Sequence, residues 1–181
     1  MLLRIFASIV VAVTILFCGF NMSQNFSSSP LRVKYVSLTK DKQREIDCLA
    51  ENIYFEAAKE PRKGQLAVAF VTLNRVNSGR FPDTICGVVK QRDSSVCQFS
   101  WYCESKPHYI SKNKLLTRES NSLYNEIHEL ATYFYVNHEM LDDPSNGALF
   151  YHADYVNPRW PNMIRTAVIG RHIFYQKRGF V

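Results

Sequence analysis

Two adjoining stretches of helical periodicity, separated by a proline, constrain the fold of this chain more than any other feature. In the first stretch, apolar residues recur every three or four positions, as one face of a helix requires: Ile46, Leu49, Ile53 and Ala57. Thr39 or Asp41 can cap the start of this helix. Because a residue before proline avoids the helical conformation, Pro61 predicts that the helix ends near Lys59.

The second stretch predicts a helix over residues 62–77. Its apolar stripe has the same spacing: Leu66, Ala69, Phe70, Leu73 and Val76. Gly79 follows at the position where helices commonly stop. The chain therefore predicts two consecutive helices of similar length, joined by a tight connection at Glu60 and Pro61.

The rest of the chain predicts more helix and then a small sheet. A short helix is expected within residues 84–91, an extended or looped segment at 97–103, and a long helix over 118–140. "DDPSNG" at 142–147 is a strong turn signal. Residues 148–156 and 167–175 are rich in β-type residues and are expected to be two strands that pair. The predicted fold class is α+β, mostly helical with a small C-terminal β-sheet.

The N-terminus predicts export. Arg4 precedes residues 5–20, which are apolar and uncharged, and this is typical of a signal peptide or signal anchor. The run is short for a membrane span, which needs about 20 residues, yet no clear cleavage site follows it. We therefore expect a signal peptide or anchor at 1–22, a Ser- and Asn-rich flexible linker at 23–38 and the functional domain at 39–181. The expected location is the periplasm or cell envelope, with residues 5–20 as an inner-membrane anchor if they are not removed.

The cysteine count agrees with export. Cys18 lies in the apolar segment and leaves an even number, Cys48, Cys86, Cys97 and Cys103, as expected for disulfides in an exported chain. Four cysteines allow three pairings, and we favour a short Cys97–Cys103 loop with Cys48–Cys86 joining more distant segments. A zinc site is the alternative, but the CxxC spacing of zinc sites is absent.

The net charge of +6 suits a polyanionic partner, although solubility alone would explain it equally well. Nucleic acid, a membrane surface and an anionic cell-wall polymer are the candidate partners. The sequence has no block of five like charges and no run of basic and aromatic residues, which argues against nucleic acid.

Glu56 is the main candidate for chemistry. Asn52, Glu56 and Glu60 are spaced four apart and stack along one side of the first helix. A carboxyl at the edge of an apolar surface loses solvation, which raises its pKa and suits a general acid acting on a glycosidic oxygen. The alternative is an ordinary solvated glutamate. Glu60 is a possible second acid, but Arg62 and Lys63 could neutralise it in a structural role.

Histidine and cysteine chemistry is less well supported. His128 and His138 each precede a glutamate, but neither completes the HExxH zinc motif. His152 is flanked by aromatic residues and could line a sugar cleft or simply be packed. A Cys97–His152 peptidase would need a free thiol, which a disulfide would remove. The aromatic residues in polar surroundings are further cleft candidates: Trp101, Tyr102 and Trp160.

An ordered series of motifs resembles the SleB/CwlJ-type cell wall hydrolases, a family that includes spore cortex-lytic enzymes. The series consists of "CLAENIYFEAAKEPRKGQLAVAFVTLNRVNSGRFPDTICGVVKQ", "CQFSW", "GALFYHADYVNPRW" and "IGRHIFY". It covers residues 46–176, nearly the whole predicted domain.

This resemblance implies a lysozyme-like fold and cleavage of peptidoglycan between N-acetylmuramic acid and N-acetylglucosamine. It also implies that Glu56 is the catalytic acid/base, because the family motif Tyr-x-Glu-Ala-x-x-Glu is matched by Tyr54, Glu56, Ala57 and Glu60. Lys59 stands where the family usually has glycine, which could change the helix end and the cleft rim. Candidate substrate contacts are Asn52, Gln65, Gln98, Ser100, Tyr151 and His152.

Two mechanisms follow from the resemblance, a lytic transglycosylase that needs Glu56 alone and a hydrolase that would use water and a second acid. The rival functions are a non-catalytic peptidoglycan-binding or regulatory protein on the same fold and a peptidoglycan peptidase or amidase. The expected partners are the glycan strands, the membrane if the N-terminal segment is retained, and a protein regulator that the sequence does not identify. No metal or organic cofactor is expected.

Overall fold

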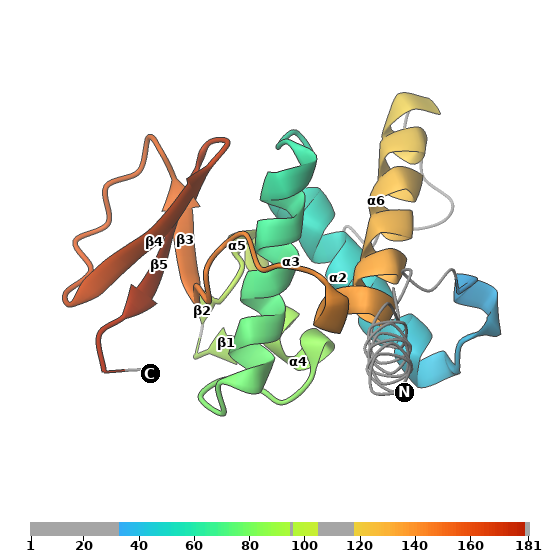
Figure 1. Ribbon diagram of the computed structural model, residues 1–181, viewed down its shortest axis with the longest axis horizontal. Coiled ribbons are helices and arrows are strands. Elements are labelled where there is room, and N and C mark those ends of the chain that lie inside the picture. Colours follow the sequence, from blue (N-terminus) through green and yellow to red (C-terminus); the bar gives the residue numbers. More distant parts are fainter. Residues whose placement is uncertain (1–32, 95, 105–117, 180–181) are drawn as a thin grey trace, which may run out of the picture. The chain divides into compact units, whose positions relative to one another are not determined.

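The two helices expected from the apolar stripes lie next to each other in a computed structural model that describes residues 33–94, 96–104 and 118–179 (Figure 1). Helix α2, Lys40–Ala57, is capped by the Thr39 side chain, which accepts a hydrogen bond from the backbone N–H of Lys42. It ends two residues earlier than predicted. Helix α3, Arg62–Asn77, begins directly after Pro61 and has the predicted bounds.

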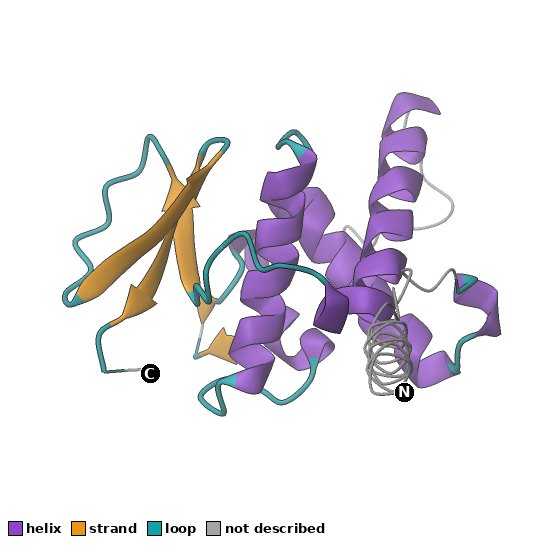
Figure 2. Ribbon diagram, viewed as in Figure 1, coloured by secondary structure: helices purple, strands orange, loops and turns teal. Residues whose placement is uncertain are grey.

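Helix α3 lies with the sheet on one side and with helix α2 and the long helix α6, Arg118–Asn137, on the other (Figure 1 and Figure 2). Ala69 and Phe70 belong to the main core with α2 and α6. Ala67 and Val71, on the other side of α3, form a second core with Phe174 from the sheet. Because α3 is covered on both sides, its burial extends well beyond the single stripe that the sequence showed.

The shorter elements depart from the prediction in two places. Helix α4, Ile85–Val89, was expected, and η1, Tyr35–Ser37, was not. The segment 97–103 was predicted to be extended or looped, but only β2, Val96–Cys97, is extended, where it pairs with β1, Arg92–Asp93. Helix α5, Ser100–Glu104, follows it at once. The predicted 118–140 helix ends at Asn137 and continues as the 3-10 turn η2, His138–Met140.

The sheet has three antiparallel strands in the order β3-β5-β4: β3, Phe150–Ala153, β4, Met163–Ile169, and β5, His172–Lys177. The predicted pairing of the first strand with the last segment is confirmed, since Tyr151 lies opposite Phe174. The prediction of one strand over 167–175 was wrong, because a two-residue turn at Gly170 and Arg171 folds this region into the β4–β5 hairpin. Gly170 has φ +57°, which glycine adopts without strain. The fold is α+β with a small C-terminal sheet, as expected.

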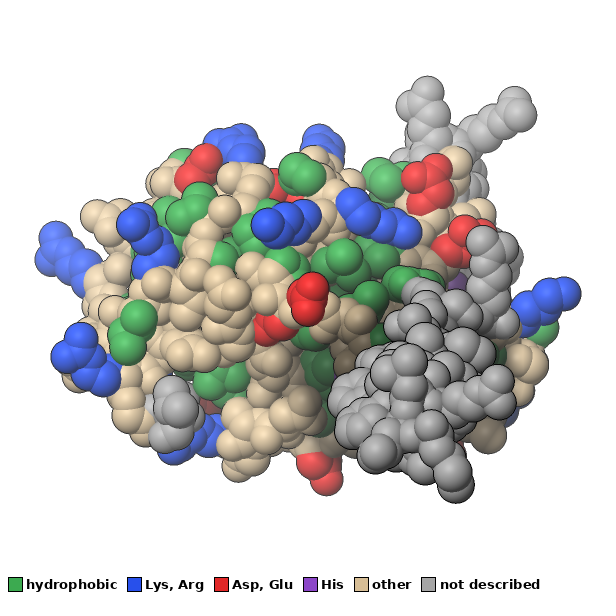
Figure 3. Space-filling model, in the orientation of Figure 1, with side chains coloured by type: hydrophobic (Ala, Val, Ile, Leu, Met, Phe, Trp, Pro, Cys, Tyr) green, Lys and Arg blue, Asp and Glu red, His purple; other side chains and the backbone are tan. Residues whose placement is uncertain are grey.

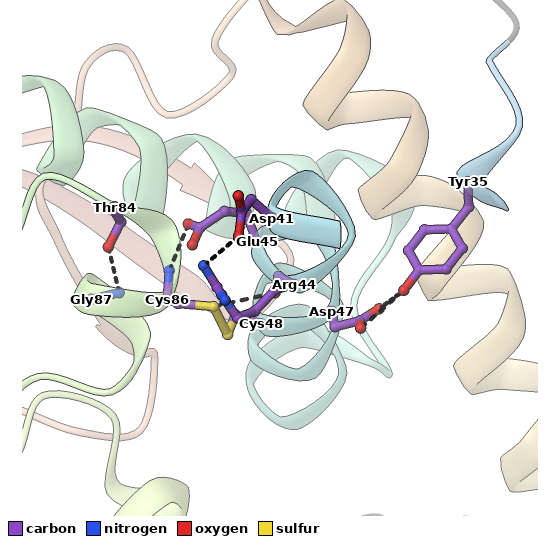
Figure 4. The surroundings of a disulfide bond; sticks show 9 residues. All are labelled: Tyr35, Asp41, Arg44, Glu45, Asp47, Cys48, Thr84, Cys86 and Gly87. Atoms are coloured by element: carbon purple, nitrogen blue, oxygen red, sulfur yellow. Dashed lines mark hydrogen bonds and ion pairs between the residues drawn. A yellow bond between two sulfur atoms is a disulfide. The ribbon is translucent and has the colours of Figure 1, made fainter. Parts of the chain in front are cut away.

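Two disulfides join separate elements in the favoured pairing. Cys48 on α2 is bonded to Cys86 at the start of α4 (Figure 4). Beside it, the Glu45 carboxylate accepts a hydrogen bond of 3.0 Å from the backbone N–H of Cys86. The second disulfide joins Cys97 on β2 to Cys103 on α5. The first bond therefore fixes α4 on α2, and the second closes a short local loop.

The residues just before α2 pack on the domain. Tyr35 donates a hydrogen bond to the Asp47 carboxylate, with oxygen–oxygen distances of 2.8 and 3.0 Å (Figure 4). Tyr35 and Leu38 also pack against the main core. The end of the segment expected to be a linker, from residue 33 to 38, is thus part of the packed structure. The expected signal or anchor at 1–22 lies outside the described residues, and within the described ranges no helix is long and apolar enough to cross a membrane.

Charged side chains are dispersed over the face seen in Figure 3. Lysine and arginine side chains are separated from one another there and do not form a single block. The part of this face that is coloured by residue type therefore shows no continuous basic groove of the kind that suits nucleic acid.

Candidate active site

Glu56 lies in the last turn of α2, where the helix approaches strand β3. Its side chain is half-buried, and its Oε2 accepts a hydrogen bond of 2.9 Å from the hydroxyl of Tyr151. The two residues are 95 positions apart in the sequence, so only the tertiary fold brings them together. The pair joins the main helical layer to the inner face of the sheet.

The pKa of Glu56 is raised above its ordinary value. Burial is the largest cause, because the charged carboxylate loses solvation. The hydrogen bond from Tyr151 and the charge of Arg75 act in the opposite direction, since both favour the carboxylate. The protein therefore holds a proton on Glu56 more readily than water would. Tyr151 and Arg75 stabilise the carboxylate that forms when the proton leaves.

Arg75 on α3 is the charged residue that sequence reasoning missed. It is only 3% exposed, and its Nε donates a hydrogen bond of 2.7 Å to the backbone carbonyl of Leu149. The guanidinium carbon lies 5.2 Å from the ring centroids of Phe81 and Phe99 and 5.9 Å from that of Phe150. One terminal nitrogen is buried without a hydrogen-bond partner.

This burial lowers the pKa of Arg75 to about 10, against the opposing effects of Tyr151 and Glu56, so the guanidinium stays charged at neutral pH. A fixed positive charge is thus enclosed next to the Glu56–Tyr151 pair. Burial raises the pKa of Glu56 and of Tyr151, and the positive charge of Arg75 opposes both rises. A nearby cation favours the anionic forms of the carboxyl and of the phenol.

A turn before β3 places Tyr151 against Glu56. Asp143 accepts hydrogen bonds of 2.8 Å from the backbone N–H groups of Ser145 and Gly147, which form the predicted turn. Asn74 on α3 donates to both Asp143 and the backbone carbonyl of Ala148. Together with the hydrogen bond from the Arg75 side chain to Leu149, these contacts fix the chain to α3 just before strand β3 begins. They thereby set the position along the strand at which Tyr151 meets Glu56.

Glu60, the possible second acid, has a structural contact. Its Oε2 accepts a hydrogen bond of 2.9 Å from the backbone N–H of Arg171 in the β4–β5 turn. A side chain at Gly170 would collide with this carboxylate. Burial raises the pKa of Glu56 while Tyr151 and Arg75 act to lower it, and Glu60 is not among the groups that shift it. The Glu60 carboxylate therefore attaches the β4–β5 hairpin to the segment that follows α2.

Two of the expected substrate contacts are interior residues. Asn52 is fully buried, and its amide donates to Thr72 on α3 at 3.1 Å and accepts from the Trp101 indole at 3.3 Å. Gln65 is 7% exposed, and its amide donates to the Ala58 carbonyl at the end of α2. The polar groups of both residues thus form hydrogen bonds within the helical layer, and a contact of either residue with substrate stays a prediction.

Gln98, Ser100 and Trp101 lie together on the β2–α5 segment. Gln98 and Ser100 are exposed, and Gln98 lines a cavity of about 480 Å³. Trp101 stacks on Phe55, the residue before Glu56, with ring centroids 4.5 Å apart and planes at 18°. Because Trp101 also reaches Asn52, one turn before Glu56, this segment is attached to the helix that carries the candidate acid. Gln98 and Ser100 remain candidates for substrate contact.

His152 lies on the other face of the sheet from Glu56. Successive residues of a strand point to opposite faces, and Tyr151 faces the helices. His152 accordingly contacts Tyr175 and Trp160, with ring centroids 5.2 and 5.6 Å away. Tyr151 and His152, both expected as substrate contacts, therefore lie on opposite faces of the sheet.

In the part of the chain that the structure describes, the groups that a peptidase or amidase would need are not brought together. The Cys97 sulfur is bonded to Cys103, so it offers no thiolate to His152. Among the described residues, no group of three His, Cys, Asp or Glu side chains is arranged to hold a metal ion.

Spore cortex-lytic enzymes are among the known proteins that this chain is similar to in sequence. A spore cortex-lytic enzyme of Bacillus cereus is 28% identical over 134 residues, which are 73% of this chain and 44% of that protein. The one from Halalkalibacterium halodurans is 30% identical over 135 residues, 72% of this chain and 34% of that protein. The chain thus spans less than half the length of these relatives.

Solved structures match the fold as well. The catalytic domain of the Bacillus cereus SleB protein has a TM-score of 0.50 and 28% identity, covering 74% of this chain and 91% of that one. The catalytic domain of SleB from Bacillus anthracis, a germination-specific lytic transglycosylase, has the same TM-score and identity and is covered to 95%. The family model for Cell Wall Hydrolase matches residues 59–175. This chain belongs to the cell wall hydrolase family.

Proposed function

We propose that this protein cleaves the glycan strand of peptidoglycan between N-acetylmuramic acid and N-acetylglucosamine, as a lytic transglycosylase with Glu56 as its single acid/base. The observation that carries the proposal is the Glu56 carboxyl itself, half-buried, with a raised pKa and a hydrogen bond from Tyr151. Family membership supports the substrate class, and the Bacillus anthracis relative, described as a lytic transglycosylase, supports the reaction type.

The first step is proton transfer from Glu56 to the glycosidic oxygen. The bond between that oxygen and C1 of the muramoyl residue breaks, and the N-acetylglucosamine residue leaves with a free hydroxyl. Positive charge develops at the muramoyl C1, and Glu56 is left as a carboxylate. Tyr151 and Arg75 stabilise this carboxylate, because both favour its charged form.

The second step uses the same carboxylate as a base. Glu56 takes the proton of the muramoyl 6-hydroxyl, and that oxygen bonds to C1 and closes a 1,6-anhydro ring. Glu56 regains its proton, and no water is consumed. The contact of Glu60 with the Arg171 backbone agrees with this scheme, which requires no second carboxylate.

The two rival functions have weaker support. A non-catalytic binding or regulatory protein would not need a half-buried carboxyl with a raised pKa at position 56. A peptidase or amidase would need a metal site or a free thiol, and Cys97 is in a disulfide.

We also propose an exported protein that acts in the cell envelope, held at the membrane through residues 5–20 if that segment is retained, with a protein regulator restraining it.

Digestion of purified peptidoglycan followed by mass spectrometry tests the proposal. The protein is expected to release anhydro-muropeptides, and Glu56→Gln is expected to release them at least about 100-fold more slowly. Glu51→Gln is the matched control, because Glu51 is another α2 glutamate whose pKa is raised by burial. It should keep full activity. Reducing-end products would show a hydrolase and reopen the search for a second acid, and equal products from the Glu56→Gln variant would overturn the proposal.

A further inference from the structure

The outer face of the sheet, turned away from Glu56, carries a pocket that the proposed reaction does not use. Its volume is about 260 Å³. It lies between the strands and the loop 154–162, which Figure 1 shows on the side of the sheet away from α3. Its lining includes both polar and apolar groups: His152, Asp154, Asn157, Trp160, Ile173 and Tyr175.

The aromatic part of this pocket resembles a site for a ring with an apolar face. Trp160 is 41% exposed although it is the largest side chain in the lining. Its ring is nearly perpendicular to that of Tyr175, at 86°, with centroids 6.2 Å apart. A partly exposed tryptophan ring beside a second ring at right angles forms a corner, and a sugar ring can place its C–H face against an aromatic wall of such a corner.

The polar part presents a hydrogen-bond acceptor. The Nδ1 atom of His152 lies 2.8 Å from the carbonyl oxygen of Ala153, which can only accept, so Nδ1 carries the proton. In the neutral ring Nε2 is then an acceptor, and it receives the hydroxyl proton of Tyr175 at 3.0 Å. The Tyr175 oxygen is left with its lone pairs for an incoming donor, such as a sugar hydroxyl or an acetamido N–H.

We propose that this pocket is a second glycan-binding site, which holds one N-acetylated sugar ring of the same polymer that is cleaved at Glu56. The volume suits a single sugar residue, because it is below the about 300–1,000 Å³ of pockets for drug-sized ligands. The identity of the polymer rests on the proposed function. A second contact on a polymer raises the overall affinity without changing the chemistry at the first.

The chain's two tryptophans allow the two sites to be observed separately. Trp101 is attached to α2 near Glu56, and Trp160 lines the outer pocket. In a Glu56→Gln background, Trp101→Phe leaves Trp160 as the only tryptophan, and Trp160→Phe leaves Trp101. The probe is a peptide-free glycan strand of alternating N-acetylglucosamine and N-acetylmuramic acid. We expect a saturable change in the fluorescence of Trp160 that Tyr175→Phe abolishes.

Binding to insoluble peptidoglycan gives a second measurement. Trp160→Ala should weaken binding about tenfold or more, as the loss of a central aromatic contact does. Tyr155→Ala is the matched control, since Tyr155 is a 76% exposed aromatic residue of the same loop that does not line the pocket. It should leave binding unchanged. Equal effects of the two variants, or a Trp160 signal produced by free stem peptide and not by the glycan, would overturn the inference.

The inference and the proposed function fail in different ways. If the protein with Glu56 releases anhydro-muropeptides but Trp160 does not respond to glycan, the second site is refuted and the proposed reaction stands. If Trp160 responds to glycan but no products are released, the site stands and the proposed reaction is refuted.

Discussion

The hydroxyl of Tyr151 donates a hydrogen bond of 2.9 Å to the Glu56 carboxylate, across 95 residues of sequence. Tyr151 is in turn placed by the contacts of α3 with the segment before β3. The protonation of the candidate acid therefore depends on a residue of the sheet as well as on the helix that carries it.

Glu56→Gln should reduce the rate of glycan cleavage by about 10²- to 10⁴-fold, the usual contribution of a general acid or base. Glutamine can still accept the Tyr151 hydrogen bond but has no proton to give. The rate of release of soluble products from peptidoglycan measures this. A loss smaller than about tenfold would mean that another group performs the proton transfer.

Tyr151→Phe should move the alkaline limb of the pH–activity profile to higher pH. The Tyr151 hydrogen bond lowers the pKa of Glu56, so its removal lets burial raise that pKa further. The protonated acid then persists to higher pH. The measurement is kcat/KM against pH for the wild type and the variant. A limb that stays in place or moves to lower pH would contradict the role assigned to Tyr151.

Glu56→Gln should also change how stability depends on pH. Because the folded protein raises the pKa of Glu56, its favourable contribution to folding is complete below the unfolded pKa, about 4.3. It is lost as pH rises through the folded pKa. The variant should therefore gain Tm relative to the wild type as pH rises from about 4 to about 8. Calorimetry measures this difference, and a difference that does not vary with pH would count against the raised pKa.

Gly170→Ala should destabilise the protein more than Glu60→Gln. An alanine at 170 must adopt positive φ, which costs about 1–2 kcal/mol, and its Cβ would collide with the Glu60 carboxylate. Glu60→Gln keeps an acceptor for the Arg171 N–H. Urea unfolding measures both free energies. Glu60→Gln should keep most of its activity, and a loss as large as that of Glu56→Gln would restore Glu60 as a second acid.

Removal of the Cys48–Cys86 disulfide should destabilise the protein more than removal of the Cys97–Cys103 disulfide. The pairs are separated by 38 and 6 residues. Loop-closure entropy then predicts losses of about 4 and about 2 kcal/mol. Paired Cys→Ala variants, compared by thermal unfolding under oxidising conditions, test the order. Equal losses would mean that the loop lengths do not control the effect.

The helices were predictable because their signals are local. The apolar stripe of α2 and the proline after it predicted the end of that helix to within two residues. Both ends of α3 were predicted as observed. The second apolar side of α3, with Ala67 and Val71, was not apparent, because small residues give a weak signal in any stripe. The position of α3 between two cores depends on helix α6 and on the sheet, and both lie far from α3 in the sequence.

The hairpin and the site depended on tertiary contacts. Gly170 was placed inside a strand because β-type residues flank it on both sides, although it marks the turn. Asn52 shares a side of α2 with Glu56, but α3 and Trp101 cover that position. Arg75 sits in "TLNRV", and an arginine within an apolar helix was the only sign that it is buried. None of these three outcomes can be read from spacing along one element.

The alternation of side chains along β3 makes the length of the preceding segment critical. Tyr151 faces the acid and His152 faces the outer pocket, so a shift of one residue would exchange them and leave an imidazole beside Glu56. One added or deleted residue between Asp143 and Phe150 would thus alter both faces of the sheet at once. The loop 154–162 follows the strand, so a change in its length would leave Tyr151 beside Glu56 and would alter the outer pocket alone. Length changes before β3 should therefore affect the candidate acid, and length changes in this loop should affect only the second site.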